Sequence, residues 1–205
     1  MSDLTQETLV DWAGQFYPRG FPPEEDDASE SIPAHHRTPE HQRFIDAWKT
    51  ALDWKEWGAF VEDLRATHPE HALGGGTQPF VSACLRCQLY KEEPQPDGNR
   101  QVTRWAVAVS VLAPLYIVYV TTQTRYPTGR TSRPILSLEP RNVGKAQADL
   151  LARHTERVLN CRPFPLSLAT VPLPGLRIGQ LNYLSTDPAP TLLDAFFTDD
   201  LANLP

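Results

Sequence analysis

The feature that most constrains the fold is a change in the spacing of apolar residues near Pro79. Before this point, apolar side chains recur every three or four residues, which is the helical period. After it, residues 81–89 alternate between apolar and polar, and residues 102–112 and 115–124 are rich in β-branched side chains. The pair Asp97-Gly98 is a typical hairpin turn between two such runs. Consecutive strands joined by short connections predict an antiparallel sheet.

Helices are predicted before and after these strands. Thr38-Pro39 combines a capping hydroxyl with proline at the first helical position, so a helix begins there. It should bend near residues 53–58 and end before His68-Pro69, because a residue that precedes proline avoids the helical region. The same reasoning predicts an amphipathic N-terminal helix and two later helices, at residues 3–17, 142–160 and 190–197.

These elements together indicate an α+β fold. The expected order is α-β-β-β-α-β-β-α, with a fourth short strand possible at 133–139 and two weaker strands at 166–171 and 176–184. The antiparallel sheet should carry its helices on one side. An extra N-terminal helix and a linker precede it, so we predict an appendage at residues 1–38 and a single α+β domain at residues 39–205. Gly74-Gly75-Gly76 is interpreted as a flexible break.

Charge is distributed unevenly along the chain. The net charge is −6, and residues 1–40 hold nine acids and two bases, which leaves residues 41–205 nearly neutral. This balance argues against a nucleic-acid partner, which requires a basic face, and favours a basic protein partner. The run Glu24-Glu25-Asp26-Asp27 lies among five prolines of residues 18–39, a composition typical of a mobile linker.

The chain also lacks the patterns of a membrane or exported protein. The longest apolar run, residues 105–120, is interrupted by Ser110 and Pro114, and is shorter than the about 18 to 20 residues of a membrane-spanning helix. Residues 1–15 are polar and acidic rather than a signal peptide. The cysteine count is odd, at three. We therefore expect a cytoplasmic protein with no membrane partner.

No catalytic or metal-binding arrangement can be assembled from the spacing of reactive residues. Cys84 and Cys87 are three apart in an alternating strand, so they should point to opposite faces and cannot share a zinc ion. Cys161 follows His154 by seven residues, which is too far along a helix for a nucleophile–base pair. We expect a non-enzymatic protein without a metal or cofactor.

Candidate partner-binding residues are an aromatic anchor and acidic groups. Trp54 is offset by about 200° from the line of Trp48 and Leu52, so it should face either the N-terminal helix, at Trp12 and Phe16, or a partner. Bases between residues 125 and 145 suit a solvated loop, a phosphate or an acidic partner loop. The predicted binding residues are Glu24, Glu25, Asp26, Asp27, Trp54, Asp194, Asp199 and Asp200.

The segment 191–200, Thr-Leu-Leu-Asp-Ala-Phe-Phe-Thr-Asp-Asp, resembles the short terminal helix of some immunity proteins from bacterial polymorphic toxin systems. The resemblance implies an α+β cytosolic protein without catalytic residues, which caps a cognate toxin; it carries over no particular binding residue. The order of elements is also similar to that of type III secretion chaperones, which implies a secreted effector as the alternative partner. Both interpretations leave the oligomeric state open.

Overall fold

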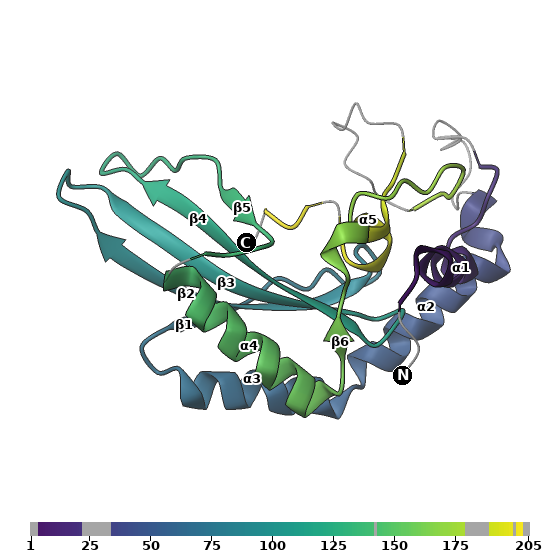
Figure 1. Cartoon of the computed structure of the whole chain (residues 1–205), viewed down its shortest axis with the longest axis horizontal. Coiled ribbons are helices and arrows are strands. Elements are labelled where there is room, and N and C mark those ends of the chain that lie inside the picture. The colour runs from purple at the N-terminus through teal and green to yellow at the C-terminus, as the bar shows by residue number, and fades with distance from the viewer. Residues whose placement is uncertain (1–3, 22–33, 142, 179–188, 199, 203–205) are drawn as a thin grey trace.

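The computed structural model describes residues 4–21, 34–141, 143–178, 189–198 and 200–202. Its α-helices are α1 (Gln6–Phe16), α2 (Pro39–Leu52), α3 (Lys55–Thr67), α4 (Val143–Leu159) and α5 (Leu192–Phe196). Its strands are β1 (Ala72–Gly75), β2 (Cys84–Pro94), β3 (Arg100–Ser110), β4 (Leu115–Arg125), β5 (Ile135–Ser137) and β6 (Arg162–Pro163). Short 3-10 turns lie at Ala34–Arg37 and Leu166–Leu168. The predicted α+β class is confirmed (Figure 1).

The sheet is antiparallel through its main path. Its strands follow chain order, β1-β2-β3-β4-β5, while β6 pairs with β4 in parallel. The predicted hairpin joins β2 to β3, with Gly98 at φ 82°, a conformation that glycine adopts without strain. Asp97 Oδ1 accepts a hydrogen bond from the Asn99 backbone N–H at 3.0 Å, which closes this turn.

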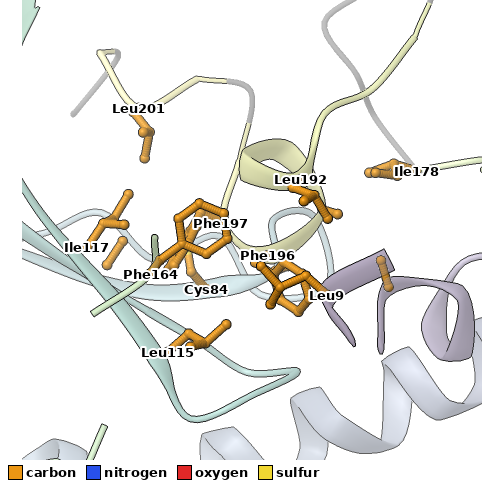
Figure 2. Close-up of a cluster of buried hydrophobic side chains, with 14 of the residues drawn as sticks. Leu9, Cys84, Leu115, Ile117, Phe164, Ile178, Leu192, Phe196, Phe197 and Leu201 are labelled. Atoms are coloured by element: carbon orange, nitrogen blue, oxygen red, sulfur yellow. The ribbon is translucent and has the colours of Figure 1, made fainter. Parts of the chain in front are cut away.

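The two faces of the sheet are covered differently. Helices α3 and α4 lie along one face, whereas α1 and α5 lie at one end of the opposite face (Figure 1). The α3–α4 core contains Phe60, Leu64, Val107 and Leu151, among others. The α1–α5 core, drawn in Figure 2, gathers residues from helices and strands far apart in sequence: Leu9, Ala13, Cys84, Ala106, Ala108, Leu115, Ile117, Phe164, Leu192, Phe196 and Phe197.

The helix ends follow the local sequence signals. Thr38 caps α2, because its side chain accepts a hydrogen bond from the His41 N–H at 3.2 Å. The predicted bend is a complete break, since α2 ends at Leu52 and α3 begins at Lys55. Helix α3 ends at Thr67, directly before His68-Pro69 as expected.

Several strand predictions need correction. Gly74 and Gly75, two of the three glycines predicted to form a flexible break, belong to strand β1, which pairs with β2. Strand β2 starts at Cys84 rather than at residue 81, and it is buried on both faces over its first six residues instead of on one. Residues 166–168 form a 3-10 turn in place of a strand. Of the strand expected at 176–184, Leu176 makes one isolated bridge to Arg19, and residues 179–188 lie outside the described residues.

Helix α1 packs into the core of the domain that follows it. Leu9 and Ala13 are fully buried in the α1–α5 core. The hydroxyl of Tyr17 donates a hydrogen bond to the backbone oxygen of Ala195 at 2.7 Å, which ties the end of α1 to α5. Thr5 caps α1, because its side chain accepts a hydrogen bond from the Thr8 N–H at 3.2 Å. Within the described residues, no helix combines the length and apolar character needed to cross a membrane.

Candidate functional site

An apolar groove lies where α2 ends and α3 begins, and we call it the Trp54 groove. Its volume is about 400 Å³. Three parts of the chain form it: the last turns of α2, the β3–β4 connection, and the end of α4. The lining residues are Ala47, Thr50, Ala51, Trp54, Ser110, Val111, Leu112, Ala113, Pro114, Leu159 and Cys161.

Trp54 forms one wall of this groove because of the break between the two helices. Its backbone is extended, at φ −74° and ψ 99°, and its N–H donates to the Ala51 carbonyl at 3.3 Å. The indole is partly buried and packs against both the α1–α5 core and the α3–α4 core. Trp54 therefore forms part of the groove wall and does not project freely from the surface. The sequence predicted that Trp54 faces either the N-terminal helix or a partner. In the structure, the surface that it packs against is largely the protein's own core.

The β3–β4 connection forms the opposite wall. The side chain of Ser110 accepts a hydrogen bond from the Leu112 N–H at 3.2 Å and donates to the Ala83 carbonyl at 3.5 Å. The Pro114 carbonyl accepts from the Arg162 N–H at 3.0 Å, which anchors the connection to β6. These bonds fix the shape of the groove before any ligand arrives, a condition that lowers the entropic cost of binding.

The chemistry of the Trp54 groove is apolar. None of the described residues that line it is charged. Burial raises the pKa of the Cys161 thiol to about 11, so the thiol stays protonated at neutral pH and is a poor nucleophile. The Ser110 hydroxyl is engaged with backbone groups, and the groove lining includes no histidine or carboxylate to activate it. The groove can receive an apolar side chain.

The predicted acidic residues lie elsewhere. Glu24, Glu25, Asp26, Asp27 and Asp199 fall outside the described residues. Asp194 belongs to a capping box at the start of α5: its Oδ2 accepts from the Thr191 N–H and hydroxyl, each at 2.8 Å. The Asp200 carbonyl accepts from Arg86 Nη1 at 3.2 Å. The structure does not bring Asp194 or Asp200 to the Trp54 groove, since neither lines it.

A second groove of about 390 Å³ lies between α4 and the segment 138–140. Two charged residues on its lining, Lys145 and Asp149, form an ion pair with each other at 2.6 Å. The Tyr116 hydroxyl, also on this lining, donates to Glu156 at 2.7 Å. The Lys145, Asp149 and Tyr116 side chains thus have partners within the protein, and a third charged residue, Glu139, also lies on the lining.

The prediction for Cys84 and Cys87 can be compared with the structure directly. Cys84 lies in the α1–α5 core and Cys87 in the α3–α4 core, which confirms that they occupy opposite faces of the sheet. Burial raises the pKa of each thiol to about 12. The rings of His36 and His41 stack at 4.1 Å between centroids. Within the described residues, no group of histidine, cysteine and acidic side chains has the arrangement of a metal site.

Sequence reasoning missed a polar row on the sheet. Arg86 is one of the polar residues of the alternating run 81–89, yet it is 2% exposed. Tyr119 and Thr121 of β4 lie on the same face and are completely buried. The available signal was an arginine inside an otherwise apolar strand, a residue type that is rarely buried without a partner.

Comparisons of the chain with protein-family models, with curated proteins and with solved structures found no match.

Proposed function

We propose that this chain is a non-enzymatic protein-binding module, and that it acts as an immunity protein that occludes a cognate bacterial toxin. The observation that carries this proposal is the Trp54 groove, a preformed apolar recess of about 400 Å³ whose described lining residues are all uncharged. Recesses of this kind receive the buried anchor residues that dominate the affinity of protein interfaces. In this proposal the partner inserts an apolar side chain against Trp54.

The electrostatic part of the proposal concerns the rate of association. The acidic run at residues 24–27 precedes α2, the helix that contributes one wall of the groove. An acidic segment attracts a basic partner over distances of about 10 Å at moderate salt, which accelerates encounter more than it strengthens the final complex. Asp194 contributes less to this attraction, because its carboxylate is engaged in the capping box.

A binding measurement with a filled groove tests the proposal. Ala47 lies on the groove lining and is partly exposed on α2, so Ala47→Leu fills the recess from the surface while the core remains intact. The matched control is Ala146→Leu, at an exposed position of α4 outside the groove. The probe is the protein encoded next to this chain, expressed in an inactive form.

We expect Ala47→Leu to weaken that complex by at least about tenfold, chiefly through faster dissociation. Ala146→Leu should leave the affinity unchanged. Equal affinities for the wild type and Ala47→Leu would exclude the groove as the binding site. Absence of any complex with the neighbouring product would remove the support for the immunity role.

The alternative, a secretion chaperone, is favoured by one specific feature. Strand β5 is an edge strand, and its Ile135 is 71% exposed. Exposed apolar edge strands accept an added strand from a partner. Replacing Ile135 with lysine should abolish effector capture if the chain is a chaperone, and should leave toxin binding unchanged if the Trp54 groove is the site.

A further inference from the structure

A second surface that points to a partner is the end of the sheet that lies beyond α1 and α5. These two helices lie at one end of the face opposite α3 and α4 (Figure 1). Among the described residues, no helix lies over the other end of that face, where β2 and β3 meet in their hairpin (Figure 1). We call this end the arginine face, and its residues are Tyr90, Glu92, Arg100, Arg104, Gln123, Arg125 and Leu136. Strand alternation gives them the same side of the sheet as Ala106 and Ala108 of the α1–α5 core.

The strand register sets these side chains in rows across the arginine face. Tyr90 and Arg104 are direct neighbours on β2 and β3, and Leu136 lies two strands beyond Arg104 in the same row. Two rows further along the same face, Arg100 lies directly opposite Arg125. Like charges that face each other across a strand pair destabilise a sheet. The face therefore carries a repulsion that an added negative charge would relieve.

Positive charge exceeds negative charge on this face. Arg100 Nε and Arg125 Nη1 lie 3.3 and 3.1 Å from the same atom, Oε1 of Glu92. Arg104 Nη1 donates instead to the neutral side chain of Gln123, at 3.1 Å. Burial lowers the pKa of Arg104, and the nearby charge of Arg125 lowers it further. Within the described part of this face, three arginines thus have one carboxylate among them.

The surrounding sequence reinforces this imbalance. Residues 100–138 contain five arginines and no aspartate or glutamate, although the whole chain has a net charge of −6. Two of the five, Arg130 and Arg133, are exposed in the connection between β4 and β5. The arginine face is therefore a basic region on an acidic protein. Such a region attracts an acidic segment of a partner more strongly than the rest of the surface does.

The side chains of the arginine face are accessible, and they include apolar ones. The side chains of Arg100 and Arg125 are 55% and 49% exposed. Tyr90 and Leu136 are also exposed, and they add apolar area beside the guanidinium groups. Tyrosine and arginine are enriched among the residues that dominate protein interfaces. A nucleic acid offers negative charge but no aliphatic group for Leu136, so this mixture favours a polypeptide.

We infer that the arginine face docks an extended segment of a partner protein that carries both acidic and apolar side chains. Alternate side chains of an extended segment point the same way about 7 Å apart, which matches the spacing of the rows on the sheet. Each guanidinium presents a planar edge of N–H donors to a carboxylate of the partner. None of these residues lines the Trp54 groove, so the inference is independent of the proposed function.

The test is a fluorescence anisotropy titration of the full-length chain with a labelled synthetic peptide. The peptide repeats two glutamates followed by two valines, so each side of the extended peptide alternates acid and apolar group. The control peptide has lysine in place of every glutamate. We expect saturable binding of the acidic peptide, with an affinity that falls as salt is added, and no saturable binding of the basic one.

The first pair of variants removes a positive charge on or off the face. Arg125→Gln should weaken binding of the acidic peptide by about threefold, the effect of one exposed ion pair. The melting temperature should not fall, because Glu92 keeps its contact with Arg100. The matched control is Arg153→Gln, at an exposed position of α4 on the other side of the sheet. Its affinity should equal that of the wild type.

The second pair removes a negative charge from one side or the other of the same strand. Glu92→Gln takes away the acid that competes with the partner for Arg100 and Arg125. It should strengthen binding of the acidic peptide by about threefold. Glu93 is the next residue of β2, faces the other side of the sheet and pairs with Lys91 at 2.7 Å. Glu93→Gln changes the net charge equally and should leave the affinity unchanged.

Three results would overturn the inference. The first is an acidic peptide that fails to saturate the protein or binds no better than the basic peptide. The second is an equal effect of the two substitutions within either pair, which would indicate attraction by overall charge. The third is a single-stranded oligonucleotide of the same net charge that binds more tightly than the acidic peptide and loses affinity in Arg125→Gln. That result would assign the arginine face to a nucleic acid.

Discussion

Replacing Leu9 with alanine tests whether α1 is part of the domain core or an appendage to it. Leu9 is fully buried and packs within the α1–α5 core. The substitution removes three carbon atoms, which at about 0.8 kcal/mol each corresponds to about 2.4 kcal/mol of lost transfer free energy. The cavity left behind adds to this, so we expect a total loss of about 3 kcal/mol in the free energy of unfolding.

The assay is equilibrium unfolding in urea, followed by both circular dichroism and tryptophan fluorescence. The matched control is Leu150→Ala, because Leu150 is a helical leucine that is 48% exposed; its effect should stay below about 1 kcal/mol. Tyr17→Phe, which removes the 2.7 Å hydrogen bond to Ala195, should cost about 1 kcal/mol. A Leu9→Ala effect no larger than that of Leu150→Ala would refute the placement of α1 in the core. Unfolding of α1 in a separate transition, at a lower urea concentration than the rest of the domain, would also refute the placement of α1 in the core.

Three further predictions concern thiols, protons and charge. Because burial raises the pKa of Cys84 and of Cys87 to about 12, neither thiol should react with iodoacetamide in the folded protein at pH 8, and both should react in urea; rapid labelling without urea would contradict their burial. Burial, reinforced by the charges of His36 and His35, lowers the pKa of His41 to about 4. Its ordinary value in an unfolded chain is about 6.5, so the unfolded chain takes up the proton first, and stability should fall as the pH drops from about 6.5 towards 4. His41→Gln should flatten that decline in urea titrations, and an unchanged slope would argue against the lowered pKa. Neutralising residues 24–27 should slow association with a basic partner and reduce its salt dependence, with little change in the off-rate; stopped-flow traces with unchanged on-rates would exclude steering by this run.

The helix ends were predictable because their causes are local. Thr38 and Pro39 carry the capping hydroxyl and the fixed φ that start α2 within a few residues of sequence. His68-Pro69 stops α3 through a clash between neighbouring residues. The β2–β3 hairpin was likewise predictable from Asp97-Gly98, since the turn needs a positive φ at the glycine.

Strand β1 was missed because its residues carry no alternating pattern. Gly74 and Gly75 have no side chains to mark a buried and an exposed face. The structure gives a reason for glycine here: a Cβ added at Gly74 would lie 3.0 Å from Gln88 Nε2. The close approach of β1 to β2 thus depends on a contact between residues distant in sequence, which a local pattern does not reveal.

The site residues depend even more on distant contacts. Arg86 is buried partly by a segment more than a hundred residues later in the chain, and its strand pattern gave no sign of that cover. The offset predicted for Trp54 assumed a continuous helix and was wrong in its premise, because α2 ends at Leu52 and Trp54 has an extended backbone before α3. Its position on a groove wall was also not predictable, because the opposite wall comes from the β3–β4 connection and the end of α4.

Growth rescue by the wild type and by Ala47→Leu tests the central claim most directly. The protein encoded next to this chain is expressed in an active form in a sensitive host, together with either variant, and binding is measured on the same two proteins. The account predicts that the wild type restores growth, while in Ala47→Leu binding and rescue are weakened together. Rescue that persists in an Ala47→Leu protein without detectable binding would contradict protection by occlusion and would indicate an enzymatic antidote.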